Sequence, residues 1–197
     1  MSANDIASRM RLGNDAGMQK FPCHFPNNLL YLPAPNGRFA SADLPRTSAF
    51  SLDDQSLPWV PFTPYCEAVE FKYLRLDPVR SEIVCFVRTS AGARMPQRYH
   101  YGRIITYTVE GSWKFLEYDW IAGPGSTVFE PPALAHTFQT LEEKGQCITL
   151  NIISGDVILL SAGGDAPAVE NWRSAMHRYL AYCERASVQP TDLTVSA

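Results

Sequence analysis

The chain has 197 residues, of which 46% are hydrophobic and 12% aromatic, and its formal net charge is −3 at pH 7. This length suits one domain with a substantial core, and the slightly acidic balance argues against nucleic-acid binding, which favours a basic surface. No apolar run has the length of a membrane-spanning helix, and the N-terminal sequence lacks the apolar centre of a secretory signal. We therefore expect a cytoplasmic protein that binds neither nucleic acid nor membrane.

The five cysteines, Cys23, Cys66, Cys85, Cys147 and Cys183, are widely and irregularly spaced. They form no CxxC pair, so the sequence indicates neither a disulfide framework nor a zinc ribbon. We expect reduced thiols that mostly fill space in the core.

Residues 1–57 are rich in Pro, Asn, Ser and Asp and contain one apolar island, "NNLLYL". This composition predicts an arm that crosses the surface or reaches a neighbouring subunit, rather than a separate domain. Such an arm offers a means of forming a homodimer, which is our hypothesis for the assembly. The segment "LPWVPFTPY" then places three prolines between aromatic residues and predicts an extended entry into the domain.

Residues 58–164 are expected to form an all-β barrel or sandwich. Short runs rich in β-branched and aromatic residues alternate with turn signals, and no helical period fits between residues 67 and 160. The runs are "EAVEFKYLRL", "SEIVCFVRTS", "RIITYTVEG", "SWKFLEYDW", "GSTVFEP", "AHTFQTL", "QCITLNIIS" and "DVILLSAG".

One helix is predicted in the range 165–187, packed on the barrel, and residues 188–197 are expected to form a flexible tail. Asp165 and Pro167 suit the start of the helix. Its apolar residues recur at steps of three and four and form one stripe. The stripe consists of Val169, Trp172, Met176, Tyr179, Leu180 and Cys183.

The stretch "PQRYHYG" places Arg98 and His100 two residues apart on a predicted strand. Residues i and i+2 of a strand point to the same side, so a metal site in a small barrel can take two ligands from H-x-H on one strand. Here Arg98 stands in the first position of such a pair. His136 ends "GSTVFEPPALAH", on a strand that we expect to face His100 across the barrel mouth.

These segments resemble the two sequence elements of cupins. The first matches from Gly92 through Arg98 and His100 to Gly111, and the second matches from Gly125 through Pro131 to His136, with Ala133 in the glycine place and Thr140 in the asparagine place. More closely, "EGSWKFLEYDW" and "EPPALAHT" resemble cupins of the 2,4'-dihydroxyacetophenone dioxygenase-like family, with acetylacetone-cleaving dioxygenases as more distant relatives. This resemblance covers about residues 57–187 and implies a double-stranded β-helix, or jelly roll, with the C-terminal helix.

The resemblance implies a non-haem Fe(II) centre held by three histidines that cleaves a C–C bond beside a carbonyl with O2. The implied substrate is a small aromatic ketone or a β-dicarbonyl, polyketide-like compound. Two of the three ligands match His100 and His136, whereas the third position holds Arg98, whose guanidinium has no acceptor lone pair. Four carboxylates can in principle replace the missing ligand, and the sequence does not choose among them. They are Glu110, Glu117, Asp119 and Glu130.

Three interpretations follow, and the dioxygenase leads. In the second, Arg98 replaces the metal electrostatically, and His100 or His136 acts as a general base in an isomerase, cyclase, dehydratase or lyase. In the third, the barrel binds a ligand without turnover. The candidate pocket residues are Tyr107, Trp113, Phe115, Glu117 and Phe129.

Overall fold

The computed structural model describes residues 51–161 and 168–194. The expected arm therefore lies outside the described residues, apart from a short 3-10 helix at Asp54–Ser56 and the buried Leu57. Cys23 also lies outside them, while the four other cysteines are buried, as predicted. No helix within the described ranges is long and apolar enough to cross a bilayer.

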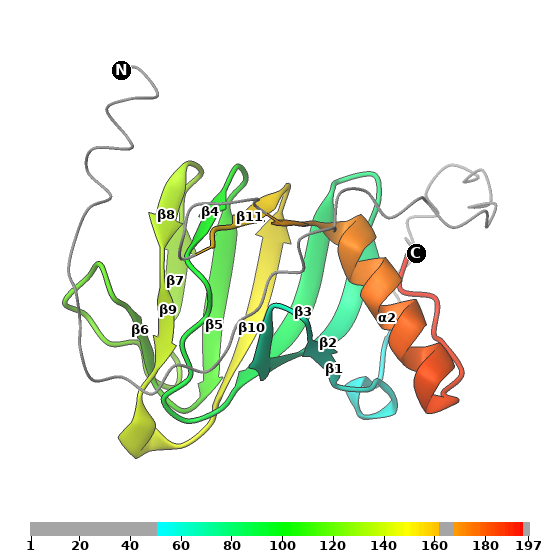
Figure 1. Cartoon of the computed structure of the whole chain (residues 1–197), viewed down its shortest axis with the longest axis horizontal. Coiled ribbons are helices and arrows are strands. Elements are labelled where there is room, and N and C mark those ends of the chain that lie inside the picture. The colour runs from blue at the N-terminus through cyan, green and yellow to red at the C-terminus, as the bar shows by residue number, and fades with distance from the viewer. Residues whose placement is uncertain (1–50, 162–167, 195–197) are drawn as a thin grey trace.

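The described chain consists of short antiparallel strands and one α-helix, which confirms the all-β prediction (Figure 1). Between residues 67 and 160, the only helical segment is a 3-10 turn at Glu142–Lys144. The strands are β1 (Val60–Phe62), β2 (Cys66–Asp77), β3 (Glu82–Thr89), β4 (Arg98–His100), β5 (Ile104–Glu110), β6 (Trp113–Phe115), β7 (Thr127–Glu130), β8 (Leu134–His136), β9 (Phe138–Thr140), β10 (Cys147–Ser154), β11 (Val157–Leu159) and β12 (Ala168–Glu170).

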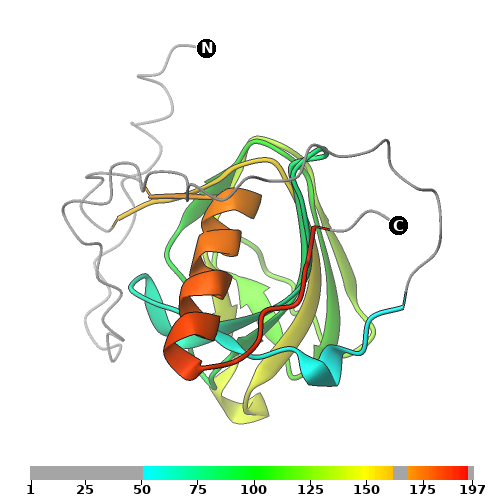
Figure 2. The same ribbon diagram turned by 90° about the vertical axis from the view of Figure 1, so that its right-hand side faces the viewer.

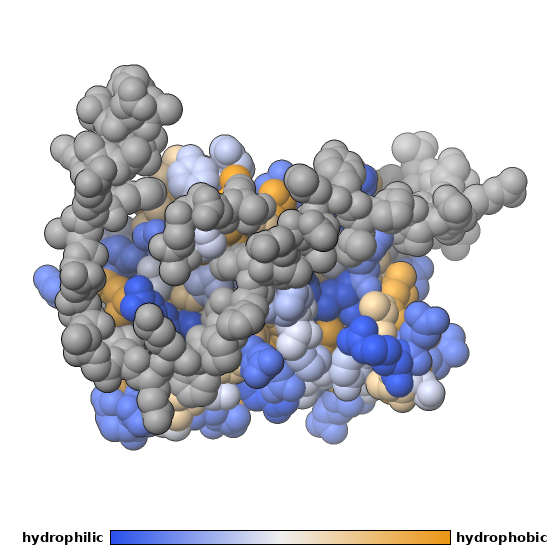
Figure 3. Space-filling view, viewed as in Figure 1, coloured by the Kyte–Doolittle hydropathy of each residue, from blue (hydrophilic) through white to orange (hydrophobic). Residues whose placement is uncertain are grey.

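Three sheets surround one interior. The largest has the order β1-β2-β3-β10-β5-β7, the second has β12-β11-β4-β8, and β6 pairs with β9. Figure 2 shows the strands curving around the common interior, with α2 (Trp172–Ala186) along one side. On the face seen in Figure 3, the described surface is mostly hydrophilic and its hydrophobic side chains are scattered.

Alternating burial along the strands explains why the sequence folds in this way. Along β3, Ile83, Cys85, Val87 and Thr89 are buried and the intervening residues are only partly so. β3 and β5 pair with the two edges of β10, so the inward side chains of these neighbouring strands form one continuous inner face. A period of two places the apolar half of each strand in the core.

The C-terminal helix begins at Trp172, later than the boundary expected near Asp165. Residues 168–170 pair with β11 as strand β12 instead, and Asn171 caps the helix. The Asn171 side chain accepts hydrogen bonds from the backbone N–H groups of Arg173 and Ser174, and Ser174 Oγ accepts one from the Asn171 N–H. This capping box is a stronger start signal than Asp165 and Pro167, which lie outside the described residues.

The helix buries a narrower face than the predicted stripe. Ala175, Met176, Tyr179 and Cys183 are buried, whereas Val169 and Leu180 are exposed. The stripe was wrong at Val169 because that residue belongs to a strand, where the helical period does not apply.

Residues 188–194, which we expected to be part of a flexible tail, contact the rest of the domain. Leu193 is 3% exposed and belongs to the core, and its carbonyl accepts a hydrogen bond of 2.9 Å from the backbone N–H of Leu76. The backbone N–H of Thr191 donates to Tyr179 Oη at 2.8 Å. These contacts connect the segment after the helix to β2 and to the helix itself.

Candidate functional site

Strands β4 and β8 bring the two predicted histidines together. Arg98 and His100 both point inward and are buried, while Tyr99 between them is only partly buried. β8 pairs directly with β4, so that Arg98 lies opposite His136. The expectation that His136 faces His100 from across the barrel was therefore wrong; the two rings lie on neighbouring strands with centroids 5.2 Å apart.

The structure selects Glu130 from the four candidate carboxylates. Glu130 is the last residue of β7 and lies opposite Ile104 of β5. Its Oε2 lies 2.9 Å from His136 Nε2 and 3.7 Å from His100 Nε2, and its side chain is 1% exposed. The other three candidates, Glu110, Glu117 and Asp119, are exposed.

The chain between Glu130 and His136 turns sharply at Ala133, which has a left-handed φ of 68°. Its backbone N–H donates to the carbonyl oxygen of His100 at 2.9 Å. Only glycine adopts this conformation without steric cost, and this is the position where the cupin pattern has glycine. The turn therefore joins Glu130 and His136 to the strand that carries His100.

A buried hydrogen bond sets the orientation of His100. Its Nδ1 lies 2.6 Å from the carbonyl oxygen of Gly102. Because a carbonyl only accepts, Nδ1 carries a proton, and in the neutral ring Nε2 is the nitrogen with the free lone pair. A Cβ at position 102 would lie 1.8 Å from the carbonyl oxygen of Ser154, so only glycine fits here.

Three buried atoms that could ligate a metal converge here, and none of them has a hydrogen-bond partner among the described residues. They are His100 Nε2, His136 Nε2 and Glu130 Oε2, and the ligating atoms of the three residues lie within 4.8 Å of one another. His136 Nε2 and Glu130 Oε2 are close but do not have hydrogen-bond geometry. Buried polar atoms without partners are rare, and two imidazoles with one carboxylate form a donor set that suits a divalent transition metal.

The protonation states also fit metal binding. Burial by itself raises the pKa of Glu130, but contacts with His136, Arg98 and Thr106 outweigh burial, so the pKa is lowered and the carboxylate stays charged. Thr106 Oγ1 donates to Glu130 Oε1 at 3.0 Å. Burial and the charge of Arg98 lower the pKa of His136, although Glu130 opposes this shift. Neutral imidazole and ionised carboxylate are the forms that bind metals.

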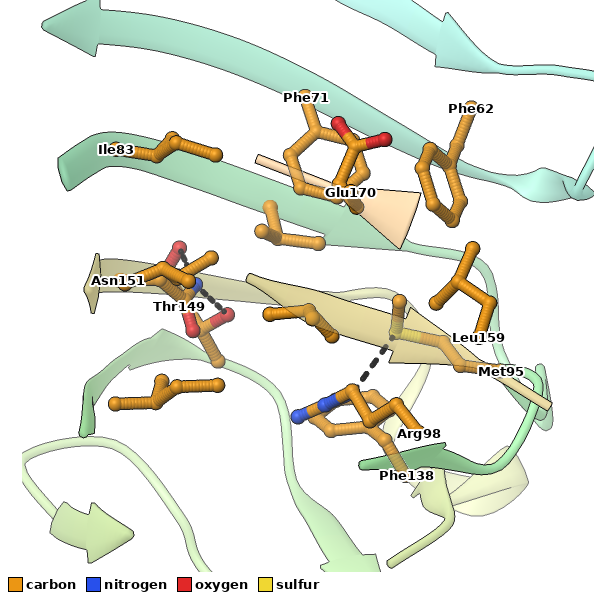
Figure 4. Close-up of a pocket in the computed structure, with 14 residues that line it drawn as sticks. Phe62, Phe71, Ile83, Met95, Arg98, Phe138, Thr149, Asn151, Leu159 and Glu170 are labelled. Atoms are coloured by element: carbon orange, nitrogen blue, oxygen red, sulfur yellow. Dashed lines mark hydrogen bonds between the residues drawn. The ribbon is translucent and has the colours of Figure 1, made fainter. Parts of the chain in front are cut away.

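Arg98 lies between this cluster and an interior cavity. Its Nη2 is 3.8 Å from Glu130 Oε2, and its Nη1 donates to Met95 Sδ at 3.7 Å. The guanidinium carbon lies 5.6 Å from the ring centroid of Phe115 and 6.0 Å from that of Phe138. The side chain thus borders the metal-type cluster, and Figure 4 shows it among the side chains that line the cavity.

The cavity is mainly apolar. Its free volume of about 50 Å³ is several times the roughly 10–15 Å³ that one water molecule needs. Besides Arg98, its polar lining comes from Thr149, Asn151 and Glu170, which Figure 4 shows around it. Asn151 connects the cavity to the cluster, because its Oδ1 lies 2.9 Å from Thr106 Oγ1. The apolar lining includes Phe62, Phe71, Ile83, Phe138 and Leu159.

None of the five predicted pocket residues lines this cavity. Tyr107 and Phe129 are 43% and 70% exposed and lie on the outer face of their strands. Trp113 and Phe115 are buried in an aromatic cluster, where the Phe115 ring stacks on His136 with centroids 3.9 Å apart. Glu117 is exposed and accepts a hydrogen bond from the backbone N–H of Thr137.

The pairing of the strands explains why the predicted pocket residues do not line the cavity. β7 exposes Phe129 and buries Glu130, the reverse of what hydrophobicity favours, because Glu130 pairs with the buried Ile104. Along β10, the residues Thr149 and Asn151 alternate with outward neighbours and face the cavity. That alternation is visible in the sequence, whereas the identity of the strand that each side chain meets is not.

Antiparallel sheets around a common interior, with two histidines and a carboxylate converging inside it, define a cupin. The chain belongs to the family of ChrR cupin-like domains, whose sequence profile matches residues 47–154. It is 40% identical to an RmlC-like cupin protein from Ralstonia eutropha JMP134, over 76% of this chain and 96% of that one, with a TM-score of 0.72.

Two further solved structures share the fold. One is a protein of unknown function with a cupin-like fold, also from Ralstonia eutropha JMP134, with 19% identity, a TM-score of 0.66 and coverage of 77% of this chain and 98% of that one. The other is an acetylacetone dioxygenase from Acinetobacter johnsonii, with 16% identity, a TM-score of 0.60 and coverage of 73% and 97%. A search of the curated proteins found no match. The comparisons confirm the cupin prediction; the finer resemblance to dihydroxyacetophenone dioxygenases stays a prediction.

Proposed function

We propose that this protein binds Fe(II) through His100, His136 and Glu130 and cleaves a C–C bond of a small aromatic ketone or β-dicarbonyl compound with O2. One observation carries the proposal. Three buried, potential metal-ligating atoms converge beside an apolar cavity, and none of them has a hydrogen-bond partner among the described residues. Two histidines and one carboxylate form the ligand set of many non-haem Fe(II) oxygenases, which leaves positions open for substrate and O2.

Fe(II), when bound, supplies Lewis-acid and one-electron chemistry that activates the substrate and O2. The protein's own residues hold and orient the ligands. Gly102 O fixes the tautomer of His100, Thr106 holds one oxygen of Glu130, and Phe115 covers the face of His136. Partners of this kind set the orientation and basicity of metal ligands. The fold shared with an acetylacetone dioxygenase is consistent with the reaction class but does not carry it.

A second candidate is a metal-independent enzyme, and one observation favours it. Arg98, a permanent cation, is buried at the cavity wall next to the cluster. A fixed cation in a dry cavity stabilises a developing enolate or phenolate, and His136, whose pKa is lowered by burial, is neutral and able to accept a proton. The reaction would be an isomerisation, cyclisation, dehydration or non-oxidative cleavage. A ligand-binding cupin without turnover is the third candidate.

Metal analysis and oxygen uptake separate the three candidates. Protein purified without oxygen and offered Fe(II) is expected to hold close to one iron per chain, and to consume O2 with acetylacetone or a hydroxyaryl ketone. His100→Ala, His136→Ala and Glu130→Gln should lose the iron, whereas Asp119→Asn, which changes an exposed carboxylate, should retain it. Turnover in the presence of a chelator would instead support the metal-independent enzyme, and neither iron nor turnover would support the binding protein.

A further inference from the structure

Arg98 has hydrogen-bonding capacity that its surroundings do not use. A guanidinium has five N–H donors and no acceptor. Among the described residues, its one hydrogen bond goes to Met95 Sδ, a weak acceptor, and Glu130 Oε2 lies beyond hydrogen-bond distance at 3.8 Å. The residue is only 8% exposed. Buried cations ordinarily have strong acceptors, so this arrangement indicates that an acceptor from outside the described residues completes it.

The charges around the cavity favour an anion at Arg98. Glu170, the carboxylate in the lining, already has both oxygens bound to Arg178, at 2.6 and 2.7 Å. Figure 4 shows Arg98 beside Phe138 on one side of the cavity, and Glu170 between Phe71 and Phe62 on the other. An anionic group is therefore attracted to the Arg98 side, and an apolar body fits against the aromatic side chains.

We propose that Arg98 binds the anionic group of the ligand, which is a small molecule with one carboxylate or enolate and an apolar body. This ligand belongs to the class of substrate that we assign to the site described above, and calling it the substrate rests on the proposed function. Arg98 is then a binding residue that orients the anion beside the histidines, and a carboxylate or enolate matches its planar fork with two parallel hydrogen bonds.

The negative charge of Glu130 partly offsets the attraction of Arg98 for an anion. At 3.8 Å the carboxylate attracts the guanidinium and repels an incoming anion. Removing the negative charge of Glu130 should therefore strengthen anion binding at Arg98. This gives the proposal a test in which one variant gains affinity and another loses it, which a general loss of structure cannot imitate.

The test measures the binding of benzoate and of its uncharged isostere benzamide to the full chain by calorimetry, with a chelator present so that no metal takes part. Wild type should prefer benzoate. Glu130→Gln should bind benzoate more tightly than wild type, and Arg98→Met, which keeps the length and apolar packing of the side chain, should bind it roughly 10- to 100-fold more weakly, as expected for a lost charge-assisted pair. The double variant should behave like Arg98→Met.

Equal affinity for benzoate and benzamide would overturn the proposal, and so would benzoate binding that survives Arg98→Met. Failure of both wild type and Glu130→Gln to bind benzoate at millimolar concentrations would overturn it as well. If Arg98→Met does not fold, the comparison of the two probes in wild type and Glu130→Gln still decides the matter. The binding test involves neither metal nor oxygen. Its outcome is therefore independent of the test of the proposed oxygenase activity.

Discussion

Arg98 on β4 lies directly opposite His136 on β8, and both side chains point into the interior. A permanent cation therefore occupies the position from which a third histidine would reach the site. Glu130 approaches from β7 and supplies a carboxylate 2.9 Å from His136 Nε2. The site thus combines two imidazoles and one carboxylate with a guanidinium at its edge.

Replacing Arg98 by histidine should strengthen metal binding. Arg98→His removes a positive charge close to the cluster and adds an imidazole on the same strand face. We expect the affinity for Co(II) to rise by at least about tenfold, measured by absorption spectroscopy in competition with a chelator. Arg103→His, on an exposed position of the neighbouring loop, should leave the affinity unchanged. Equal affinities in all three proteins would mean that Arg98 does not hinder a metal.

Adding a methyl group at Gly102 should disturb both the fold and the site. The Cβ would lie 1.8 Å from the carbonyl oxygen of Ser154, so the backbone that holds His100 Nδ1 must move. Gly102→Ala should lower the free energy of unfolding by about 1–3 kcal/mol and weaken Co(II) binding by roughly 10- to 100-fold. Urea denaturation and metal titration measure these effects.

Gly123→Ala is the matched control for this change. A Cβ at Gly123 would meet only Ser112 Oγ, at 3.6 Å, which is ordinary van der Waals contact. This variant should keep the stability and the metal affinity of wild type. A Gly102→Ala protein that also kept both would show that His100 does not depend on this close approach.

The buried ion pair between Arg178 and Glu170 should be sensitive to the loss of one partner. Arg178 also donates to Tyr73 Oη at 2.8 Å. Burial by itself lowers the pKa of Arg178, but the charge of Glu170 raises it overall. Arg178→Met leaves a buried carboxylate without its partner and should cost about 3–5 kcal/mol in chemical denaturation. The double variant with Glu170→Gln should recover part of this loss.

A partly exposed ion pair serves as the comparison. Arg88 and Glu70 pair at 2.6 Å, with about a third of each side chain exposed. Arg88→Met should cost no more than about 1 kcal/mol, because solvent screens such pairs. Losses of the same size at the two positions would contradict the importance that we assign to burial.

The carboxylate of Asp77 should make stability depend on pH below the neutral range. Burial by itself raises its pKa, but hydrogen bonds from the backbone and side chain of Arg80 and from the Val79 N–H, with the charge of Arg75, lower it overall. Its pKa in the folded protein is thus below the unfolded value of about 3.9. The stabilisation is complete above that value and is lost as pH falls through the lower, folded pKa.

Asp77→Asn tests this dependence. At pH 7 the variant should be less stable than wild type by about 1.5–3 kcal/mol, as expected for hydrogen bonds to a charged group. The difference should shrink as the pH falls below about 4. Urea denaturation at a series of pH values measures it, and a difference that stays constant into the acid range would contradict the role of the charge.

The sequence by itself determined the all-β architecture, the cupin family and the inward direction of Arg98 and His100, because alternation along a strand is a local property. The family resemblance implied three histidine ligands, with Arg98 in the place of one, and the sequence left four carboxylates as possible replacements. The position of His136 beside His100, however, depended on which strands pair, and β8 proved to be the neighbour of β4.

Tertiary structure alone decided that Glu130 lies beside the two histidines and that Phe129 faces solvent. Hydrophobicity favours the opposite arrangement, but the pairing of β7 with β5 places Glu130 beside Thr106, His136 and Arg98, whose interactions offset the cost of burying a charge. The packing of residues 188–194 was decided in the same way, because the Leu193 carbonyl contacts Leu76, which is distant in sequence. Local patterns specify the face of each strand, whereas the partners of a buried polar group come from the assembled fold.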